Sequence, residues 1–309
     1  MSFSVDKNTR IYIAGCGGML GQSVYAVFNQ IANVLATDID VNEPWLKFAD
    51  VRDIDGITKS VMDFKPDVII NLAAITDMEN CEKLQDNAWL TNSLGAENLA
   101  LLALKLNIPH IYISTAGIFG GEKEFFTDFD TPNPLSIYAK SKFAGELFIK
   151  QTLSKYYVVR AGWMMGGGPD KDKKFVNKIY KQLVAGKKEL LVVDDKLGTP
   201  TYTLDFANGL LKLLQSEYYG VYNQVCPGSC SRYDVALKFI HLMGLTDIVS
   251  VKKVSSDYFA NEYFAPRPYS EKLLNLKLIA RNLMVMRNWE DCLADYAKIY
   301  QAHWSNLQK

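Results

Sequence analysis

Short apolar segments alternate with helical segments along the first half of the chain. The expected strands cover residues 11–14, 34–37, 67–72, 110–114 and 157–160, and the expected helices cover residues 21–31, 91–106 and 136–153. The strand segments are continuous apolar, β-branched runs, which is typical of a parallel sheet that is covered on both faces. The alternation therefore predicts an α/β fold in which a parallel sheet is doubly wound by helices.

The pattern changes after Ala161, and a second domain is expected there. We expect a loop over residues 162–174, which are rich in glycine and lysine, and short helices from residue 232 to the end. Further elements are expected as helices over residues 175–185 and 205–214 and as strands over residues 190–193 and 249–254. The first domain would comprise residues 1–161, with residues 199–225 returning to it. Residues 162–198 and 226–309 would form a smaller C-terminal α/β domain that binds the substrate.

Composition excludes several classes of protein. The 34 basic and 34 acidic residues balance, so no overall positive field favours nucleic-acid binding. No apolar run is long enough to cross a membrane, and the polar N-terminus does not resemble a signal peptide. Five scattered cysteines are typical of reduced thiols in a cytoplasmic protein. With only three histidines, we expect no metal site.

A glycine-rich segment, AGCGGMLGQ, follows the first strand and begins the first helix. Gly15 would permit a tight turn, Gly18 would let the backbone approach a pyrophosphate, and Gly21 would let the helix pack closely on the strand. The amides at the start of the helix, at Met19 and Leu20, would then hold the phosphates. The segment predicts a dinucleotide site, and a strand-to-helix turn without a ligand is the alternative.

Asp38 follows the second strand, 17 residues after Gly21. A carboxylate there accepts hydrogen bonds from the adenosine ribose and repels a 2′-phosphate, which favours NAD over NADP. A solvated turn aspartate is the alternative. The other expected cofactor contacts lie in loops of the same domain: Asp50 and Val51 beside the adenine, and Ala73, Ala74 and Thr76 after the strand at 67–72.

Tyr138 and Lys142 form a YxxxK motif that begins a helix, and Thr115 ends the strand that precedes it. The motif alone carries little weight, since a chain with 17 tyrosines contains roughly one or two copies by chance. Its position is informative, because i to i+4 spacing puts both side chains on one helix face. A phenol next to an ammonium can act as a general acid with a lowered pKa, while Thr115 hydrogen-bonds the same carbonyl oxygen. A solvent-facing tyrosine is the alternative.

Taken in order, these motifs resemble the extended short-chain dehydrogenase/reductase superfamily, and more narrowly the dTDP-4-dehydrorhamnose reductase family. The similar segments are GCGGMLGQ, KPDVIINLAAITDMENCE, ISTAGIFGG, PNPLSIYAKSKFAGE, VVDDKLGTPTY and APRPYS. The resemblance implies a Rossmann-type domain that binds NAD(H) or NADP(H), and a smaller domain that closes over a nucleotide sugar. It places the catalytic triad on Thr115, Tyr138 and Lys142, with Tyr138 and Lys142 also contacting the cofactor.

The resemblance also implies a sugar site, from which this chain departs. The family usually has an acidic and an aromatic residue after the threonine, where this chain has Ala116 and Gly117. It often has an aspartate where this chain has Gly120. The implied substrate contacts are Thr115, Ala116, Trp163, Phe175, Thr199 and Arg267. Trp163 would stack on the pyranose, and Arg267 would bind phosphate.

The predicted function is an NAD(P)H-dependent reductase of a nucleotide-linked 4-keto-6-deoxy sugar. One alternative is a nucleotide-sugar epimerase or dehydratase that recycles its NAD, which uses the same triad. Another is a non-catalytic NAD(P)-binding regulatory subunit on the same fold. The expected partners are a nucleotide-sugar substrate and a second copy of the chain in a homodimer, without nucleic acid or membrane.

Overall fold

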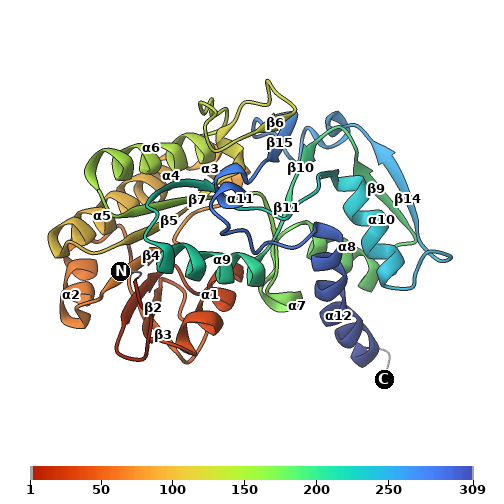
Figure 1. The fold of residues 1–309 in the computed structure, drawn as a ribbon. Helices are drawn as coiled ribbons and strands as arrows, with labels where there is room; N and C mark the ends of the chain where they lie inside the picture. The colour runs from red at the N-terminus through yellow and green to blue at the C-terminus, as the bar shows by residue number, and fades with distance from the viewer. Residues whose placement is uncertain (1–2, 308–309) are drawn as a thin grey trace.

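A sheet of seven parallel strands forms the centre of the larger lobe in the computed structural model, which describes residues 3–307 (Figure 1). The strands follow the order β12 (Gly220–Asn223), β7 (Tyr156–Ala161), β5 (His110–Thr115), β4 (Val68–Asn71), β1 (Arg10–Ala14), β2 (Asn33–Asp38) and β3 (Leu46–Phe48). Every neighbouring pair is parallel. Helices connect these strands, so the predicted Rossmann-type α/β fold is confirmed.

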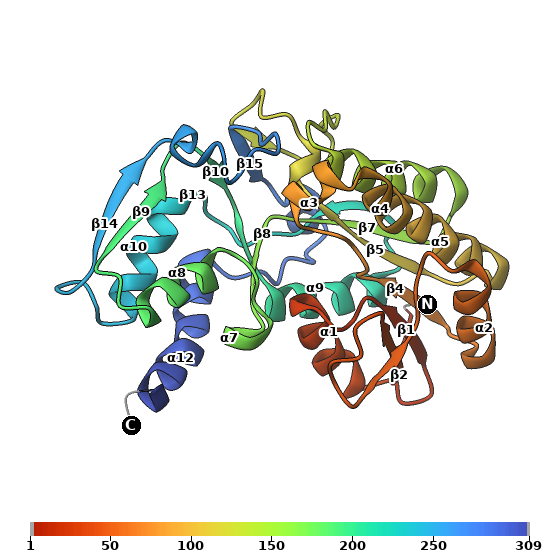
Figure 2. The same ribbon diagram turned by 180° about the vertical axis from the view of Figure 1, so that it is seen from behind.

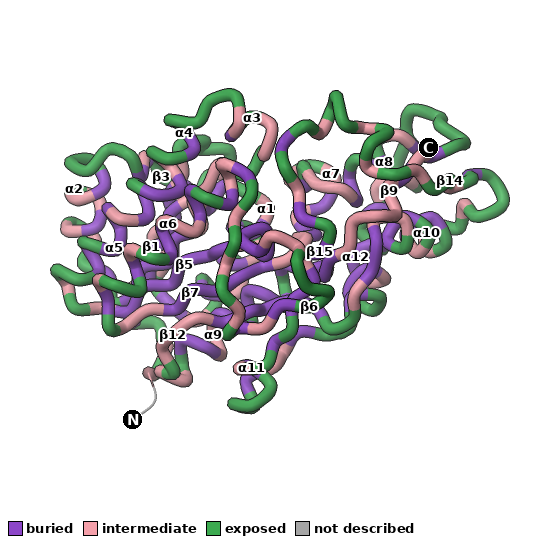
Figure 3. The backbone as a smooth tube through the Cα atoms, turned by 90° about the horizontal axis from the view of Figure 1, so that it is seen from above, coloured by how far each residue is buried: buried purple, intermediate pink, exposed green. Residues whose placement is uncertain are grey.

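Both faces of this sheet are buried because alternate side chains of a strand point to opposite faces. In β1, Ile11 and Ile13 join one hydrophobic core, whereas Tyr12 and Ala14 join the other. Viewed from above, the strands form the buried centre of this lobe (Figure 3). The apolar runs of the sequence reflect this double burial.

Helices α1 (Met19–Asn29) and α9 (Thr203–Ser216) cover one face of the sheet, and α2 (Ile54–Phe64), α5 (Gly95–Leu106) and α6 (Ile137–Thr152) cover the other (Figure 1). Side chains of α1 and α9 belong to the same core as Ile11, whereas those of α2 and α5 belong to the core of Tyr12. The first core continues without a break into the second lobe.

The second lobe is built from three small sheets and four helices (Figure 2). Its sheets comprise β13 (Cys230–Ser231), β10 (Leu197–Gly198), β15 (Ser270–Leu273) and β6 (Phe125–Phe126); β11 (Pro200–Tyr202) and β8 (Trp163–Met165); and β14 (Ser250–Val254) and β9 (Glu189–Val193). Its helices are α7 (Gly168–Lys171), α8 (Phe175–Val184), α10 (Arg232–Leu242) and α12 (Trp289–Leu307). The remaining short helical segments are α3 (Met78–Lys83), α4 (Gln85–Trp89), the π-helical turn η1 (Leu90–Leu94), η2 (Ala116–Ile118), η3 (Ser256–Phe259) and α11 (Leu276–Ala280).

Three sequence-based expectations about elements were wrong. The expected loop at 162–174 contains β8 and α7. The expected helix at 91–106 is divided, because η1 precedes α5. Instead of short helices only, the chain ends in α12, whose 19 residues bury Trp289, Leu293, Tyr296 and Tyr300 at helical spacing. In the described part of the chain, no helix is long and apolar enough to cross a membrane.

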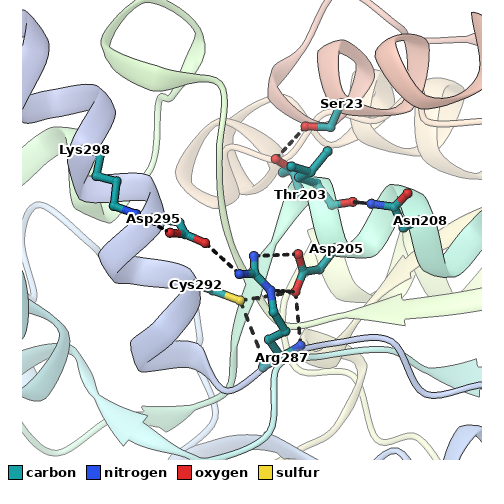
Figure 4. Close-up of polar contacts among 9 residues, drawn as sticks. Ser23, Thr203, Asp205, Asn208, Arg287, Cys292, Asp295 and Lys298 are labelled. Atoms are coloured by element: carbon teal, nitrogen blue, oxygen red, sulfur yellow. Dashed lines mark hydrogen bonds and ion pairs between the residues drawn. The ribbon is translucent and has the colours of Figure 1, made fainter. Parts of the chain in front are cut away.

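Arg287 joins the start of α12 to α9 (Figure 4). Its guanidinium donates to both carboxylate oxygens of Asp205, at 3.0 and 2.9 Å, and to Asp295 at 2.6 Å. Its backbone amide donates to Asp205 as well, at 3.1 Å. The Cys292 thiol donates to the same carboxylate at 3.4 Å. The C-terminal helix is therefore held against the larger lobe by a cluster centred on one buried aspartate.

Candidate active site

The glycine-rich segment connects β1 to α1 with little spare space. Gly15 has a φ of 75°, and a Cβ there would lie 2.3 Å from the backbone nitrogen of Ala73. A Cβ on Gly21 would lie 2.1 Å from the carbonyl oxygen of Cys16. A Cβ on Gly18, in contrast, would meet nothing within 4 Å. The loop is thus packed tightly against the sheet at Gly15 and Gly21 and is open at Gly18.

The N-terminus of α1 faces a large cleft of about 1510 Å³. Within the described residues, no side chain caps this helix end and no acidic residue lies in its first turn. Gly18, Met19 and Leu20 all line the cleft. Free amides and the positive end of a helix dipole form an anion site, so these residues fit a dinucleotide pyrophosphate.

Asp38 lies at the end of β2 and lines the same cleft. Its carboxylate accepts hydrogen bonds from the amides of Gly17, at 2.8 Å, and Asp40, at 2.9 Å. Each carboxylate oxygen retains further acceptor capacity, so the side chain is held in place and can still accept from a ribose hydroxyl. Asp50 also lines the cleft, but Arg52 takes up its carboxylate in an ion pair of 2.6 Å and lowers its pKa.

The loop after β4 supplies the remaining predicted cofactor contacts. Ala73, Ala74 and Thr76 line the cleft, as does Val51. The amide of Ala73 donates to the Asn71 side chain at 3.0 Å. The structure therefore places all the predicted cofactor residues along one cleft.

Thr115, Tyr138 and Lys142 meet at the carboxyl edge of the sheet. Ser136 caps α6 by accepting from the amide of Ala139 at 3.2 Å, so Tyr138 lies in the first turn of that helix. The Thr115 hydroxyl accepts from the amide of Gly117 at 3.1 Å and hydrogen-bonds the Tyr138 side chain. All three triad side chains line the cleft.

Burial dominates the titration of the triad. Burial raises the pKa of Tyr138 to about 12, although the hydrogen bond with Thr115 opposes this shift. Lys142 is not among the groups that shift this pKa, and the expected lowering by Lys142 together with an oxidised nicotinamide stays a prediction. The phenol is therefore protonated at neutral pH, which is the form that an acid in a reduction must have.

Lys142 is 3% exposed, and burial lowers its pKa to about 7. Its Nζ lies 4.0 Å from the ring centroid of Tyr112, as in a cation–π contact. The neighbouring carboxylate of Glu146 raises the pKa of Lys142, but less than burial lowers it. Glu146 itself is bound by Arg160 in a fully buried, two-bond ion pair at 3.0 and 2.9 Å.

The structure separates the predicted substrate contacts into two groups. Trp163, Phe175 and Arg267 line the cleft together with Thr115, whereas Ala116 and Thr199 are not part of its lining. Each of the latter two is only 2% exposed. Ala116 packs instead in a small hydrophobic cluster behind the sheet edge.

Trp163 is oriented differently from the sequence-based expectation. The guanidinium of Arg232 lies 3.6 Å from its ring centroid and covers one face. A Cβ on Gly198 would lie 2.3 Å from the same ring system, so the Gly198 backbone packs against it. The indole Nε1 donates to Glu271 at 2.6 Å. Stacking of this ring on a sugar would require Arg232 to move, so the tryptophan supports the cleft wall.

Arg232 and Glu271 were not predicted, because no sequence motif pointed to either residue. Both line the cleft, and burial lowers the pKa of Arg232 to about 10. Among the described residues, no hydrogen bond or salt bridge is found for the Arg232 guanidinium. Arg232 follows the capping residue of α10, and Glu271 lies in the short strand β15, so only the packing of the second lobe brings them to Trp163.

Polar contacts connect the two lobes across the cleft. Lys174 donates to the Thr76 hydroxyl at 2.9 Å, and Arg267 pairs with Glu79 at 2.7 Å. Arg267 also donates to the backbone oxygens of Tyr263 and Ala265. The guanidinium predicted to bind phosphate is thus already engaged. Among residues 3–307, no group of three or more potential metal ligands is found, and all five cysteines are free and buried.

Comparison with known proteins identifies relatives over almost the whole chain. A family model described as the RmlD substrate binding domain matches residues 9–302. The dTDP-4-dehydrorhamnose reductase of Mycolicibacterium smegmatis is 31% identical over 294 residues, which cover 93% of this chain and 84% of that protein.

Solved structures give the same result. The crystal structure of a dTDP-4-dehydrorhamnose reductase from Clostridium acetobutylicum superposes with a TM-score of 0.86 and 34% identity, covering 95% of this chain and 100% of that one. The reductase of Bacillus anthracis, in complex with NADP, has a TM-score of 0.85 and 29% identity, and the match covers 94% of this chain and 98% of that one.

The parallel sheet, the glycine loop and the Thr–Tyr–Lys group define a nicotinamide-dependent oxidoreductase of the extended short-chain dehydrogenase/reductase type. Within that class, the chain belongs to the dTDP-4-dehydrorhamnose reductase family, whose model covers nearly all of it. The family predicted from the sequence motifs is therefore confirmed.

Proposed function

We propose that this protein is an NAD(P)H-dependent reductase of a nucleotide-linked 4-keto-6-deoxy sugar. Its relatives are named dTDP-4-dehydrorhamnose reductases, and one of them was solved in complex with NADP. The observation that carries the proposal is the convergence of Thr115, Tyr138 and Lys142 on the cleft that the open end of α1 also faces. A dinucleotide along the glycine loop and a sugar between the lobes would both have room in this cleft.

The chain's own residues supply proton transfer and orientation. Bound NAD(P)H supplies the hydride. Tyr138, protonated at neutral pH, donates its proton to the carbonyl oxygen as negative charge develops there. Thr115 donates a second hydrogen bond to that oxygen with its one hydroxyl proton, while the amide of Gly117 holds the Thr115 oxygen in place. Lys142 holds the cofactor ribose and supports Tyr138.

For the cofactor, we propose contacts from the glycine loop, from Asp38, and from the loops at 50–51 and 73–76. NAD(H) is preferred over NADP(H) in this proposal, since the Asp38 carboxylate would lie next to a 2′-phosphate. For the substrate, we propose Thr115, Phe175 and Arg267 from the sequence-based set, with Trp163 supporting the cleft wall and Arg232 added as a cation for the diphosphate. Ala116 and Thr199 lack support as contacts.

We also propose that one lobe binds the cofactor and the other binds the substrate. Residues 1–161 and 199–225 would form the cofactor-binding domain, apart from strands β6 and β11, which join sheets of the second lobe. The assignment is supported by β12, which adds to the large sheet, and by α9, which packs on α1. Residues 162–198 and 226–309 would form the substrate-binding domain. Free, buried cysteines support a cytoplasmic location.

A homodimer is the assembly that we propose. Four leucines of the continuous helical run η1–α5 are between 40% and 50% exposed: Leu90, Leu94, Leu101 and Leu104. Their spacing of four, seven and three residues places them on one stripe of the helix. An apolar stripe of this kind is self-complementary when two copies meet about a two-fold axis.

The test is a panel of nucleotide-linked 4-keto sugars with NADH or NADPH, in which loss of the reduced nicotinamide and the identity of the product are followed. Tyr138→Phe should reduce kcat by at least about 100-fold, because the proton donor is lost, while the Kd for NADH changes little. A variant that keeps most of the rate would contradict the role of Tyr138. An epimerase or dehydratase would convert sugar without net loss of NAD(P)H, and a regulatory subunit would convert none.

A further inference from the structure

Glu271 is the carboxylate that borders the reacting end of the cleft. It lies in β15 of the second lobe, and its Oε2 accepts from the indole of Trp163 at 2.6 Å. Within the described chain, no hydrogen bond to its other oxygen, Oε1, is found. The Glu271 side chain lines the cleft and is partly exposed there. One carboxylate oxygen is therefore fixed, while the other is available to a ligand.

The free oxygen borders the same small space as Thr115. A Cβ built on Gly117 would lie 3.3 Å from Oε1 of Glu271 and 3.4 Å from Oγ1 of Thr115. Because Gly117 has no side chain, no Cβ separates these two oxygens, and both residues line the cleft. A sugar whose keto oxygen reaches Thr115 and Tyr138 would bring the substituent of a neighbouring ring carbon to Glu271.

The chemistry of the substrate class decides which neighbour this is. In a 4-keto-6-deoxy sugar, C3 carries a hydroxyl and C5 carries a methyl group. A carboxylate oxygen without a donor is satisfied by a hydroxyl and not by a methyl group. The sugar would therefore lie with its C3 side toward β15.

We propose that Glu271 is a specificity-determining residue, which accepts a hydrogen bond from the hydroxyl on the ring carbon next to the keto group. The proposal rests on the proposed reductase function and adds both the orientation of the sugar and the group that it must carry. Trp163 acts as a positioning residue here, since its indole holds Oε2 and leaves Oε1 to the ligand. Arg232, which begins α10 in the same lobe, stacks on that indole and supports the tryptophan.

The experiment compares two nucleotide-linked 4-keto-6-deoxy sugars, one with a C3 hydroxyl and one with hydrogen at C3. The native protein should favour the hydroxylated sugar by about 10- to 100-fold in kcat/KM, the range for a hydrogen bond to a charged group. Glu271→Ala should lose this preference, because the hydroxylated sugar falls to the level of the deoxy sugar. Glu271→Gln keeps a single acceptor oxygen, and its NH2 group cannot accept from the Trp163 indole or from the sugar hydroxyl, so it should retain only part of the preference.

Trp163→Phe separates a ligand contact from a structural role. This variant removes the partner of Oε2 but leaves the Glu271 carboxylate in the cleft, so the preference for the C3 hydroxyl should fall and yet stay above that of Glu271→Ala. The same comparison in binding, with the Kd values of the two reduced nucleotide sugars measured by calorimetry, gives a readout that does not depend on turnover.

Two outcomes would overturn the proposal: Glu271→Ala weakening both sugars equally, or Trp163→Phe abolishing the preference as fully as Glu271→Ala does. Failure of the proposed function would be distinct, since the native protein would then reduce neither sugar. In that case, the ratio of the two Kd values in native protein and Glu271→Ala would still decide the role of Glu271.

Discussion

At the scale of single residues, we expect the protonation state of Lys142 to be coupled to cofactor binding. Its ammonium is buried over the ring of Tyr112, and its pKa falls to about 7. Ribose hydroxyls that accept from the ammonium favour the charged form, so binding should raise this pKa. At a pH between the pKa of Lys142 in the free protein and its pKa in the complex, Lys142 is neutral in the free protein and charged in the complex.

NADH binding at pH 8 should therefore take up protons, and its affinity should weaken as the pH rises through the pKa of the complex. Calorimetry in two buffers of different ionisation enthalpy measures this uptake. Lys142→Met should abolish it, whereas Lys140→Met, a change on the exposed face of the same helix, should leave it unchanged. Binding without proton uptake in the native protein would show that Lys142 does not hold the ribose as an ammonium.

The sequence was sufficient to predict that the triad residues come together, but it did not reveal how deeply they are buried. Helical spacing and the preceding strand located Thr115, Tyr138 and Lys142. The pKa of Tyr138 depends on burial, which spacing does not reveal. Arg232 and Glu271 were not predicted because they lie in α10 and β15, far along the chain from the triad. The packing of Trp163 was not predicted because its ring partners come from those two elements.

At the scale of elements, the joint between α9 and α12 depends on Arg287 (Figure 4). Removing its side chain leaves the carboxylate of Asp205, which is 6% exposed, without its main charged partner. Since Arg287 is itself about half exposed, Arg287→Ala should lower the free energy of unfolding by about 1–2 kcal/mol.

Lys298→Ala is the matched control for this joint. Lys298 also pairs with Asp295, but its side chain is 72% exposed, so its loss should cost no more than about 0.5 kcal/mol. Urea denaturation compares the two variants. Equal destabilisation would mean that the Arg287–Asp205 contact adds nothing to the joint.

The elements that were predicted and those that were missed differ in how they are buried. Strands β1, β4, β5 and β7 are covered on both faces, so their sequences are continuous apolar runs. In α12 the buried face includes tyrosine and cysteine, which weakens the helical pattern. Strand β8 has three residues and follows a glycine, and it exists because β11 pairs with it.

At the scale of the whole molecule, the cleft lies between lobes whose segments are interleaved along the chain. Alternation predicted the larger sheet, and the change of pattern after Ala161 indicated a second unit. The contacts that connect the lobes, Lys174 with Thr76 and Arg267 with Glu79, join residues about 100 and 190 positions apart. No local pattern encodes such pairs, because they depend on how both lobes pack on their shared core.

The leucine stripe on η1–α5 gives a prediction for the assembly of the whole molecule. Two copies that bury this stripe about a two-fold axis remove apolar surface from water, and two charges placed within it would have to be buried unpaired. The double variant Leu101→Glu/Leu104→Glu should therefore be a monomer, whereas the native chain should be a dimer. Light scattering after size exclusion measures both masses. Ile279→Glu, which changes an even more exposed apolar side chain on α11, should stay dimeric. A native chain that is monomeric would contradict the proposed dimer. A double variant that still dimerises would place the interface elsewhere.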